Sequence, residues 1–173
     1  MEVDSIAVRG RWWRQVPHGS DPLFRATPLS DGRWQHGEAV GGFYLADEQD
    51  TAWAEWYRAL AELAVPPDRQ MPRDLWGWDV DVSGVADLSS AERLAAVGLD
   101  HPRPGQRRWP AFQAVGEALW RAGHRGVLTL SAARPAYRVF CLFRENDEVP
   151  GATPVRPALT YRRTPAPPTG MTT

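Results

Sequence analysis

The amino-acid sequence predicts one mixed α+β domain. Its 173 residues are enough for one buried core but too few for two separate ones. A hydrophobic fraction of 43% with 24% charged residues is typical of a globular chain rather than a disordered one. Apolar side chains alternate with period two in some segments and recur at helical spacing in others. We therefore expect several short strands and about three helices.

The first strands are expected near the start of the chain. Residues 9–29 mix aromatic, branched and proline residues around the turn "HGSD", which is typical of one or two short strands. Residues 41–46, "GGFYLA", form the next strand. Its period of two puts Phe43 and Leu45 on one face and Tyr44, between small side chains, on the other. We expect the ring of Tyr44 to be open to a ligand.

A helix is expected over residues 48–65, with Asp47 as its N-terminal cap. Glu55 lies roughly 100° around this helix from the apolar stripe, with Ala52 and Ala59 as its axial neighbours. These small neighbours leave room beside the carboxylate. The apolar stripe itself is expected to face the core, and it contains Trp53, Trp56, Leu60 and Leu63.

The second half of the chain continues the alternation of strands and helices. Residues 75–88 alternate as a strand or a hairpin would. A short helix is expected over residues 89–99, where Ser89 and Glu92 have the spacing of a capping box. Another is expected over residues 110–124, which begin with proline and end at a glycine beside a basic residue.

Two strands complete the expected domain, over residues 126–131 and 137–143, on either side of the turn "AARPA". The chain then becomes rich in proline and threonine. We expect a catalytic domain over residues 9–148. Residues 149–173 are expected to form a C-terminal segment that is flexible at its end.

Charge and cysteine content limit the classes of function. The net charge of −1 gives no overall attraction to nucleic acid or to an acidic membrane. All 20 lysine or arginine positions are arginine, so any anion site would use forked guanidinium donors. The single Cys141 excludes an internal disulfide and is expected to be buried. With no signal-like N-terminus and no long apolar run, we expect a soluble cytoplasmic protein.

Several common kinds of site are not predicted. Ser131 lacks the GxSxG setting of many hydrolases, and the chain has neither GxGxxG nor a Walker loop. No pair of metal ligands has CxxC or HxxxH spacing, so no metal site is expected. The soft ligands are instead scattered along the chain: His18, His36, His101, His124 and Cys141.

One run carries a more specific pattern. In "GRWQHGEAVGGFYLADEQDTAWAEWYRAL", Arg33, Tyr44 and Glu55 are separated by equal steps of 11 residues. "WWRQVP" precedes this run, and "GVLTLSAARPAYRVFCLF", which contains Ser131, follows it. This order resembles the RES domain, a family named for its arginine, glutamate and serine signature. The resemblance covers residues 12–145.

The resemblance implies a fold similar to that of ADP-ribosyltransferases and the cleavage of NAD⁺ at its nicotinamide–ribose bond. The acceptor would be water or inorganic phosphate, with NAD⁺ as substrate and no bound cofactor. It also implies a bacterial toxin whose partner is an Xre-like antitoxin. The chain departs from the pattern at Gln35, where the family commonly has asparagine, and in lacking the familiar asparagine after Ser131.

The same resemblance assigns roles to residues. Loss of nicotinamide builds positive charge on the ribose, which the carboxylate of Glu55 would stabilise. Tyr44 would stack on the cationic nicotinamide ring. Arg33 and an earlier arginine would bind the pyrophosphate. That earlier arginine is Arg14, with Arg25 as a rival. Catalytic roles thus fall to Glu55, Arg33 and Tyr44.

Ser131 is expected to hold a phosphate or the nicotinamide amide, on the strength of the resemblance alone. Two other classes of function stay open. One is transfer of ADP-ribose to a protein. The other is a non-catalytic module that binds a partner protein, or that uses tryptophan and arginine to bind nucleic acid. The nearly neutral net charge argues against nucleic acid.

Overall fold

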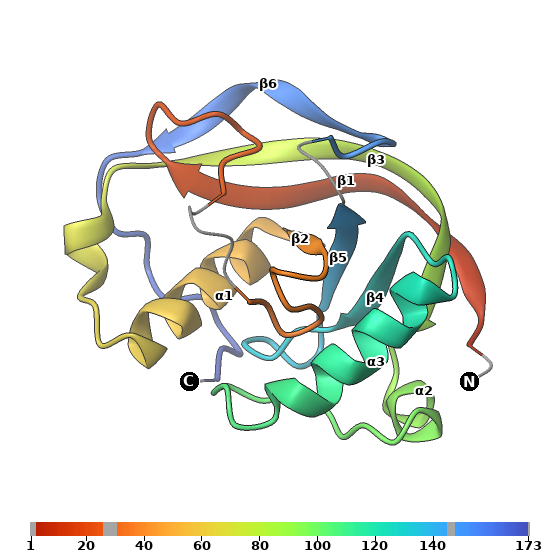
Figure 1. Ribbon diagram of the computed structural model, residues 1–173. Helices are drawn as coiled ribbons and strands as arrows, with labels where there is room; N and C mark the ends of the chain where they lie inside the picture. Colours follow the sequence, from red (N-terminus) through yellow and green to blue (C-terminus); the bar gives the residue numbers. More distant parts are fainter. Residues whose placement is uncertain (1–2, 26–30, 145–147, 173) are drawn as a thin grey trace.

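The computed structural model describes residues 3–25, 31–144 and 148–172. Within these residues, three α-helices and one six-stranded mixed sheet confirm the α+β class (Figure 1). The strands are β1 (Ser5–Pro17), β2 (Gly41–Ala46), β3 (Arg73–Leu88), β4 (Gly126–Leu130), β5 (Arg138–Arg144) and β6 (Ala152–Tyr161). The helices are α1 (Gln49–Glu62), the 3-10 helix η1 (Pro67–Gln70), α2 (Ala91–Ala96) and α3 (Trp109–Arg121).

The sheet bends back on itself. Its order is β1-β2-β5-β4-β3-β6, and β1 also pairs with β3 from Ser5 opposite Ala86 to Pro17 opposite Arg73. Five strands therefore form a closed ring of pairings, with β6 added on the outer edge of β3. Figure 1 shows β1, β3 and β6 crossing the molecule together, with the three other strands and the helices on one side of them.

The alternation predicted for β2 is confirmed. Phe43 and Leu45 are fully buried on one face, in a core cluster that includes Trp78 and Phe140. The other face carries Tyr44 and packs against a second cluster beneath α3. Cys141 of β5 lies in this second cluster and is buried, as expected. Tyr44 therefore stands at the margin of a core rather than on open surface.

Helix α1 confirms most of the predicted stripe. Trp53, Trp56 and Leu60 are buried in a third cluster that rests on Leu75 of β3. Leu63 was wrongly predicted to be buried. It is 66% exposed, because the helix ends at Glu62 and Leu63 is its C-terminal cap.

Both predicted caps were wrong. The N-cap of α1 is Glu48, and the carboxylate of Asp47 instead accepts a hydrogen bond from the backbone N–H of Arg138 (2.8 Å). Helix α2 is capped by Ser90 rather than Ser89, since the Ser90 side chain accepts from the backbone of Arg93. In both cases a neighbouring residue has the extended backbone that a cap requires.

The two longest strands, β1 and β3, are longer than the strands predicted in their place. One strand of 13 residues, β1, replaces the one or two short strands expected within residues 9–29. Residues 18–25 form turns, and residues 26–29 lie outside the described residues. Of the strand and the hairpin predicted for residues 75–88, the strand is confirmed: residues 73–88 form a single strand of 16 residues, because β3 is paired with β1 along its length.

The sequence did not predict β6. This strand follows the domain boundary that we placed at residue 148, yet it pairs antiparallel with β3 and belongs to the same sheet. After β6 the chain returns to the core. Thr172 donates its backbone N–H to Ala133 (2.7 Å), and Thr169 accepts from Arg134 (3.2 Å). We expected flexibility at the end of this segment, but as far as Thr172 it is anchored.

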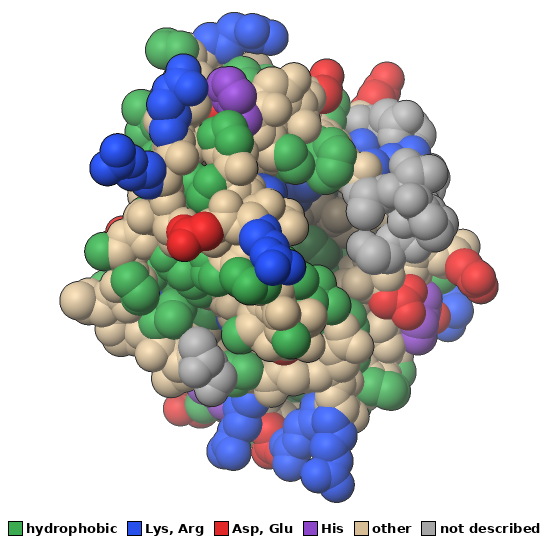
Figure 2. Space-filling view, turned by 90° about the vertical axis from the view of Figure 1, so that its left-hand side faces the viewer, with side chains coloured by type: hydrophobic (Ala, Val, Ile, Leu, Met, Phe, Trp, Pro, Cys, Tyr) green, Lys and Arg blue, Asp and Glu red, His purple; other side chains and the backbone are tan. Residues whose placement is uncertain are grey.

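The surface of the molecule is mixed in character. On the face shown in Figure 2, basic side chains stand in separate groups among acidic and apolar ones. Among the described residues, no helix has the length and apolar character needed to cross a membrane.

Candidate active site

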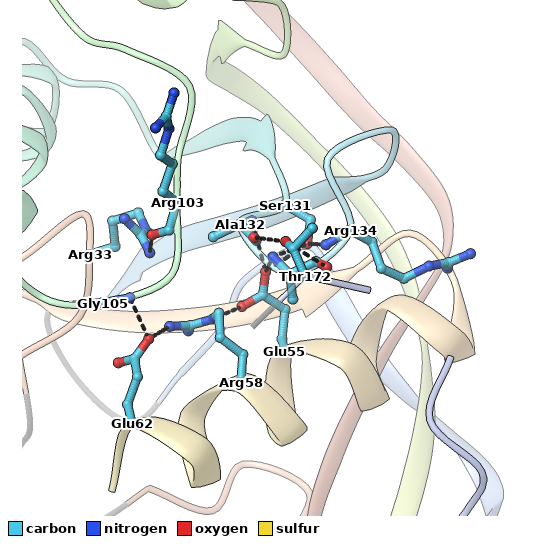
Figure 3. A network of polar contacts seen from close by, with 11 residues as sticks. Arg33, Glu55, Arg58, Glu62, Arg103, Gly105, Ser131, Ala132, Arg134 and Thr172 are labelled. Atoms are coloured by element: carbon cyan, nitrogen blue, oxygen red, sulfur yellow. Dashed lines mark hydrogen bonds and ion pairs between the residues drawn. The ribbon is translucent and has the colours of Figure 1, made fainter. Parts of the chain in front are cut away.

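Glu55 projects from the middle of α1 toward the turn that follows β4. Three donors of this turn converge on its Oε1 atom: the Ser131 hydroxyl (2.7 Å), the Ala132 N–H (3.1 Å) and the Ala133 N–H (3.2 Å) (Figure 3). This turn begins directly after Leu130, the last residue of the apolar strand β4. Glu55 is thus held in place by a segment far away in the sequence.

Ser131 also organises the turn itself. Its side chain is fully buried, and its hydroxyl oxygen accepts from the N–H groups of Ala133 (3.2 Å) and Arg134 (2.9 Å). Arg134 then reaches the first turn of α1, where it donates to Thr51 (3.0 Å) and pairs with Glu48 (3.2 Å). These contacts fix the turn and the helix that carries Glu55 relative to each other.

The second oxygen of Glu55 bonds to a cation. Arg58 donates from Nε to Glu55 Oε2 (2.8 Å) and pairs through Nη1 with Glu62, which in turn accepts the N–H of Gly105 (2.8 Å). Burial raises the pKa of Glu55, but the charge of Arg58 and the bonds from Ser131, Arg58 and Ala133 outweigh it. The net effect is a pKa below the ordinary value. Glu55 is therefore ionised at neutral pH.

Tyr44 uses its hydroxyl group within the protein. The hydroxyl donates to Gln35 Oε1 (2.7 Å) and accepts the backbone N–H of Trp34 (3.1 Å). Burial raises the pKa of Tyr44 well above its usual range, so the phenol stays neutral. A side chain at Gly32 would collide with this hydroxyl group, which explains the glycine of the "GRW" motif. The ring of Tyr44 remains free to line a cavity.

Arg33 and Glu55 line the same cavity. Arg33 is only 8% exposed, donates to the carbonyl oxygen of Arg103 (2.8 Å) and stands 5.3 Å from the centre of the Phe112 ring. Burial and the nearby Arg58 lower the pKa of Arg33, while Glu55 and other anionic groups oppose that shift. Its positive charge is thus placed close to the buried carboxylate.

Two cavities meet at Glu55, Tyr44 and Val139. The first has a volume of about 260 Å³ and is lined by Arg14 and other residues of β1, α1 and β3. The second, of about 200 Å³, lies beside Arg33 and Arg58. The carboxylate therefore stands between two spaces that each contain arginine. The aromatic and aliphatic residues that line the second cavity are Trp34, Tyr44, Trp109, Leu130, Ala132 and Val139.

The structure brings Arg14 to this site. Its guanidinium donates to the carbonyl oxygens of Phe24 (2.5 Å) and Tyr44 (3.4 Å), and it lies 4.6 Å from the centre of the Phe43 ring. Arg25 is exposed and is not among the described residues that line the first cavity. The geometry therefore favours Arg14 over Arg25 as the early arginine of the site.

Two arginines of the site were not predicted from the sequence. Arg58 follows Glu55 by three residues on one helix, a spacing that places side chains together and could have identified it. Arg73 also lines the first cavity, but it arrives there through the pairing of β3 with Pro17 of β1. No local signal marks that pairing.

The fold and the site define a class of protein: an α+β domain with an ionised carboxylate fixed between two arginine-containing cavities. Such a site suits a ligand that carries both positive and negative charge. The family model of the RES domain matches residues 11–164, and the chain belongs to this family.

Similar proteins come from mycobacteria. The NAD(+) phosphorylase MbcT of Mycobacterium bovis is 29% identical over 103 residues, which are 58% of this chain and 55% of the relative. MbcT of Mycobacterium tuberculosis matches to the same extent, so the aligned part spans about half the length of these curated relatives. The crystal structure of the M. tuberculosis MbcT–MbcA toxin–antitoxin complex has the same fold. It gives a TM-score of 0.75 at 24% identity, over 91% of this chain and 86% of that one.

Proposed function

We propose that this protein cleaves the nicotinamide–ribose bond of NAD⁺ and passes the ADP-ribosyl group to water or to inorganic phosphate. The observation that carries this proposal is the state of Glu55, which is ionised and held by the Ser131 turn and Arg58 where the two cavities meet. Positive charge develops on the ribose as the bond breaks, and a carboxylate that is already oriented stabilises it without reorganisation. Two similar proteins are named NAD(+) phosphorylase, which agrees with this chemistry.

The two cavities suit different parts of NAD⁺. The second has an aromatic and aliphatic lining beside the ring of Tyr44, which fits the flat nicotinamide group. Arg14 in the first cavity and Arg33 in the second supply forked donors for phosphate oxygens. In this arrangement the anomeric carbon of the ribose lies next to Glu55. Ser131 acts on Glu55 rather than on the substrate, since its hydroxyl bonds to the carboxylate.

The biological setting forms part of the proposal. The similar solved structure is a toxin–antitoxin complex. We infer that this protein is likewise a toxin, acting in the cytoplasm and neutralised by an Xre-like antitoxin. A small helix-turn-helix protein encoded in the neighbouring reading frame would support this inference. Co-expression with that neighbour should restore growth that the protein alone inhibits.

The direct test is to mix the purified protein with NAD⁺, with and without phosphate, and to identify the products by chromatography and phosphorus NMR. Free nicotinamide with ADP-ribose indicates water as acceptor, and nicotinamide with a phosphorylated ADP-ribose indicates phosphate. Folded protein that releases no nicotinamide in either buffer would refute the proposal. Mass spectrometry of cell extract treated with the protein separates these reactions from ADP-ribosylation of a protein.

The nucleic-acid alternative predicts a different result. Binding through tryptophan and arginine would be sensitive to salt, and it would survive Glu55→Gln, because phosphate contacts do not need that carboxylate. Titration with a labelled oligonucleotide at two salt concentrations measures this directly.

A further inference from the structure

A second buried arginine, Arg73, lines the first cavity together with Arg14. Arg73 is 8% exposed. Its Nε donates to Gln15 Oε1, and its guanidinium lies 5.7 Å from the centre of the Trp56 ring. An amide oxygen and an aromatic face are both neutral partners. Burial lowers the pKa of Arg73 to about 10, because little around it offsets the loss of hydration.

Arg14, like Arg73, is buried among neutral partners. Its partners are two backbone carbonyl oxygens and the ring of Phe43, and its Nε atom is buried with no hydrogen-bond partner among the described residues. Burial, followed by repulsion from Arg144 and Arg73, lowers the pKa of Arg14 to about 10. Within the described part of the chain, neither Arg14 nor Arg73 forms an ion pair with a carboxylate.

The carboxylate nearest in the cavity does not neutralise this pair. Glu55 is the acidic residue among the described lining residues, and its oxygens are bonded to Arg58 and to the Ser131 turn. Burying cations without a counter-ion costs free energy, and proteins normally avoid it by pairing them. Two uncompensated guanidinium groups facing one cavity are therefore the signature of a site for an external anion.

We propose that Arg14 and Arg73 together bind a phosphate-type dianion in the first cavity, next to Glu55. A guanidinium presents parallel N–H donors that match phosphate oxygens, and two of them match a charge of −2. The cavity volume of about 260 Å³ leaves room for a phosphate group and its substituent. Gln15 and Trp56 hold Arg73 toward this space.

This inference rests on the proposed function and deepens it. The dianion has two possible sources: inorganic phosphate as acceptor, or the phosphates of NAD⁺. As acceptor, one phosphate oxygen forms a bond to the anomeric carbon while the carbon–nitrogen bond breaks. The bonding pair leaves with nicotinamide, which becomes neutral, and the proton of hydrogen phosphate is released later to solvent. Glu55 stabilises the positive charge that develops on the ribose as the carbon–nitrogen bond breaks.

The test begins with binding in the absence of NAD⁺. Inorganic phosphate and, separately, pyrophosphate are titrated into the full chain by calorimetry in chloride buffer of constant ionic strength. We expect wild-type protein to bind at least one of them, and Arg73→Met to bind it roughly tenfold or more weakly. Arg69→Met is the matched control, since Arg69 is an exposed arginine of η1 and should not affect affinity. Arg73→Lys, which keeps the charge but loses the fork, should bind with intermediate affinity.

Thermal unfolding separates a binding role from a structural one. Removing an uncompensated buried cation should leave the Tm of Arg73→Met equal to or above that of wild type in phosphate-free buffer. Added phosphate should raise the Tm of wild type more than that of the variant. If Arg73→Met lowers the Tm and phosphate stabilises both proteins equally, the proposal is overturned. It is also overturned if wild type binds neither anion, or if Arg73→Lys and Arg73→Met bind as tightly as wild type.

Kinetics then identify the source of the dianion. If it is the acceptor, Arg73→Met raises the KM for phosphate more than the KM for NAD⁺. If it is part of NAD⁺, the KM for NAD⁺ rises more. A wild-type protein that binds phosphate or pyrophosphate through Arg73 but does not cleave NAD⁺ would refute the proposed function and leave the anion site standing.

Discussion

The Ser131 hydroxyl donates a hydrogen bond of 2.7 Å to Glu55 Oε1, although 76 residues separate the two in the chain. The glutamate and the serine of the RES signature are thus in direct contact, and Ser131 holds the carboxylate of Glu55 in position. Ser131 also accepts from the N–H groups of Ala133 and Arg134, so it shapes the turn that surrounds the carboxylate. Glu55 is the group whose charge the proposed reaction needs.

Glu55→Gln should abolish most of the activity. The substitution keeps the shape of the side chain but removes its negative charge, so nothing stabilises the ribose cation. Losing a comparable electrostatic contact costs roughly 100-fold or more in kcat. Nicotinamide release by purified protein measures the effect. Glu38→Gln, at an exposed position, is the control and should retain wild-type rate. A Glu55→Gln protein with wild-type kcat would show that the carboxylate has no catalytic role.

Arg58 should set the acid limit of activity. Burial raises the pKa of Glu55, and Arg58 is the largest of the groups that outweigh this effect. Removing the cation with Arg58→Met should therefore move the acidic limb of the pH profile of kcat to higher pH. Arg58→Lys, which keeps the charge, should move it less. Identical acidic limbs in wild type and Arg58→Met would contradict this account.

The same pKa governs stability. Because the pKa of Glu55 is lower in the folded chain than its ordinary value of 4.5, its contribution to stability is complete above that value. The contribution is lost as the pH falls through the lower, folded-state pKa. Chemical denaturation between pH 7 and pH 3, in wild type and Glu55→Gln, measures it as a difference that shrinks toward acid pH.

The sequence predicted those features that depend on local pattern. Alternation placed Phe43 and Tyr44 on opposite faces of β2, and helical spacing placed Trp53 and Trp56 in the core. The series Arg33, Tyr44 and Glu55 led to residues that do gather around the two cavities. In the first two cases neighbours within four residues determine where the side chain lies, whereas the series of Arg33, Tyr44 and Glu55 was recognised through the family resemblance.

Features that depend on long-range pairing were missed. Arg73 reaches the first cavity only because β3 pairs with β1, and β6 was not predicted because Pro154 and Pro157 suggest a loop. Proline cannot donate to a ladder, but β6 pairs on one side only, so its outer edge tolerates proline. The N-terminal caps of α1 and α2 were each predicted one residue too early. Which of two adjacent residues caps a helix depends on the backbone conformation of the segment before the helix, and local sequence does not determine it.

Gly116→Ala should destabilise the protein. Helix α3 packs so closely that a Cβ at Gly116 would overlap the backbone carbonyl group of Trp34. Relief requires the helix or the Trp34 loop to shift, which typically costs about 1–3 kcal/mol. That loop also binds the hydroxyl of Tyr44, so activity should fall as well. Chemical denaturation gives the change in stability. Ala118→Ser, on the exposed side of α3, serves as control, and a Gly116→Ala protein as stable as this control would contradict the packing argument.

Thr172 should affect catalysis although it lies beyond the residues that the family model matches. Its hydroxyl donates to the carbonyl oxygens of Ala132 (3.1 Å) and Ala133 (3.3 Å). The carbonyl of Ala132 and the N–H of Ala133 belong to one peptide group, and that N–H donates to Glu55. A hydrogen bond to the carbonyl polarises the peptide group and strengthens its N–H as a donor.

Thr172→Val removes these bonds while keeping the side-chain shape. One net hydrogen bond corresponds to a change of about two- to tenfold, so kcat should fall by that factor with little change in KM. Thr172→Ser keeps the hydroxyl and should retain the wild-type rate. The matched control is Thr169→Val, because Thr169 contacts Arg134 through its backbone oxygen and not through its side chain. Equal kcat values for Thr172→Val and Thr169→Val would show that the C-terminal segment does not support the carboxylate. A reduced kcat restored by Thr172→Ser would show that the hydroxyl acts on Glu55 through the intervening peptide group.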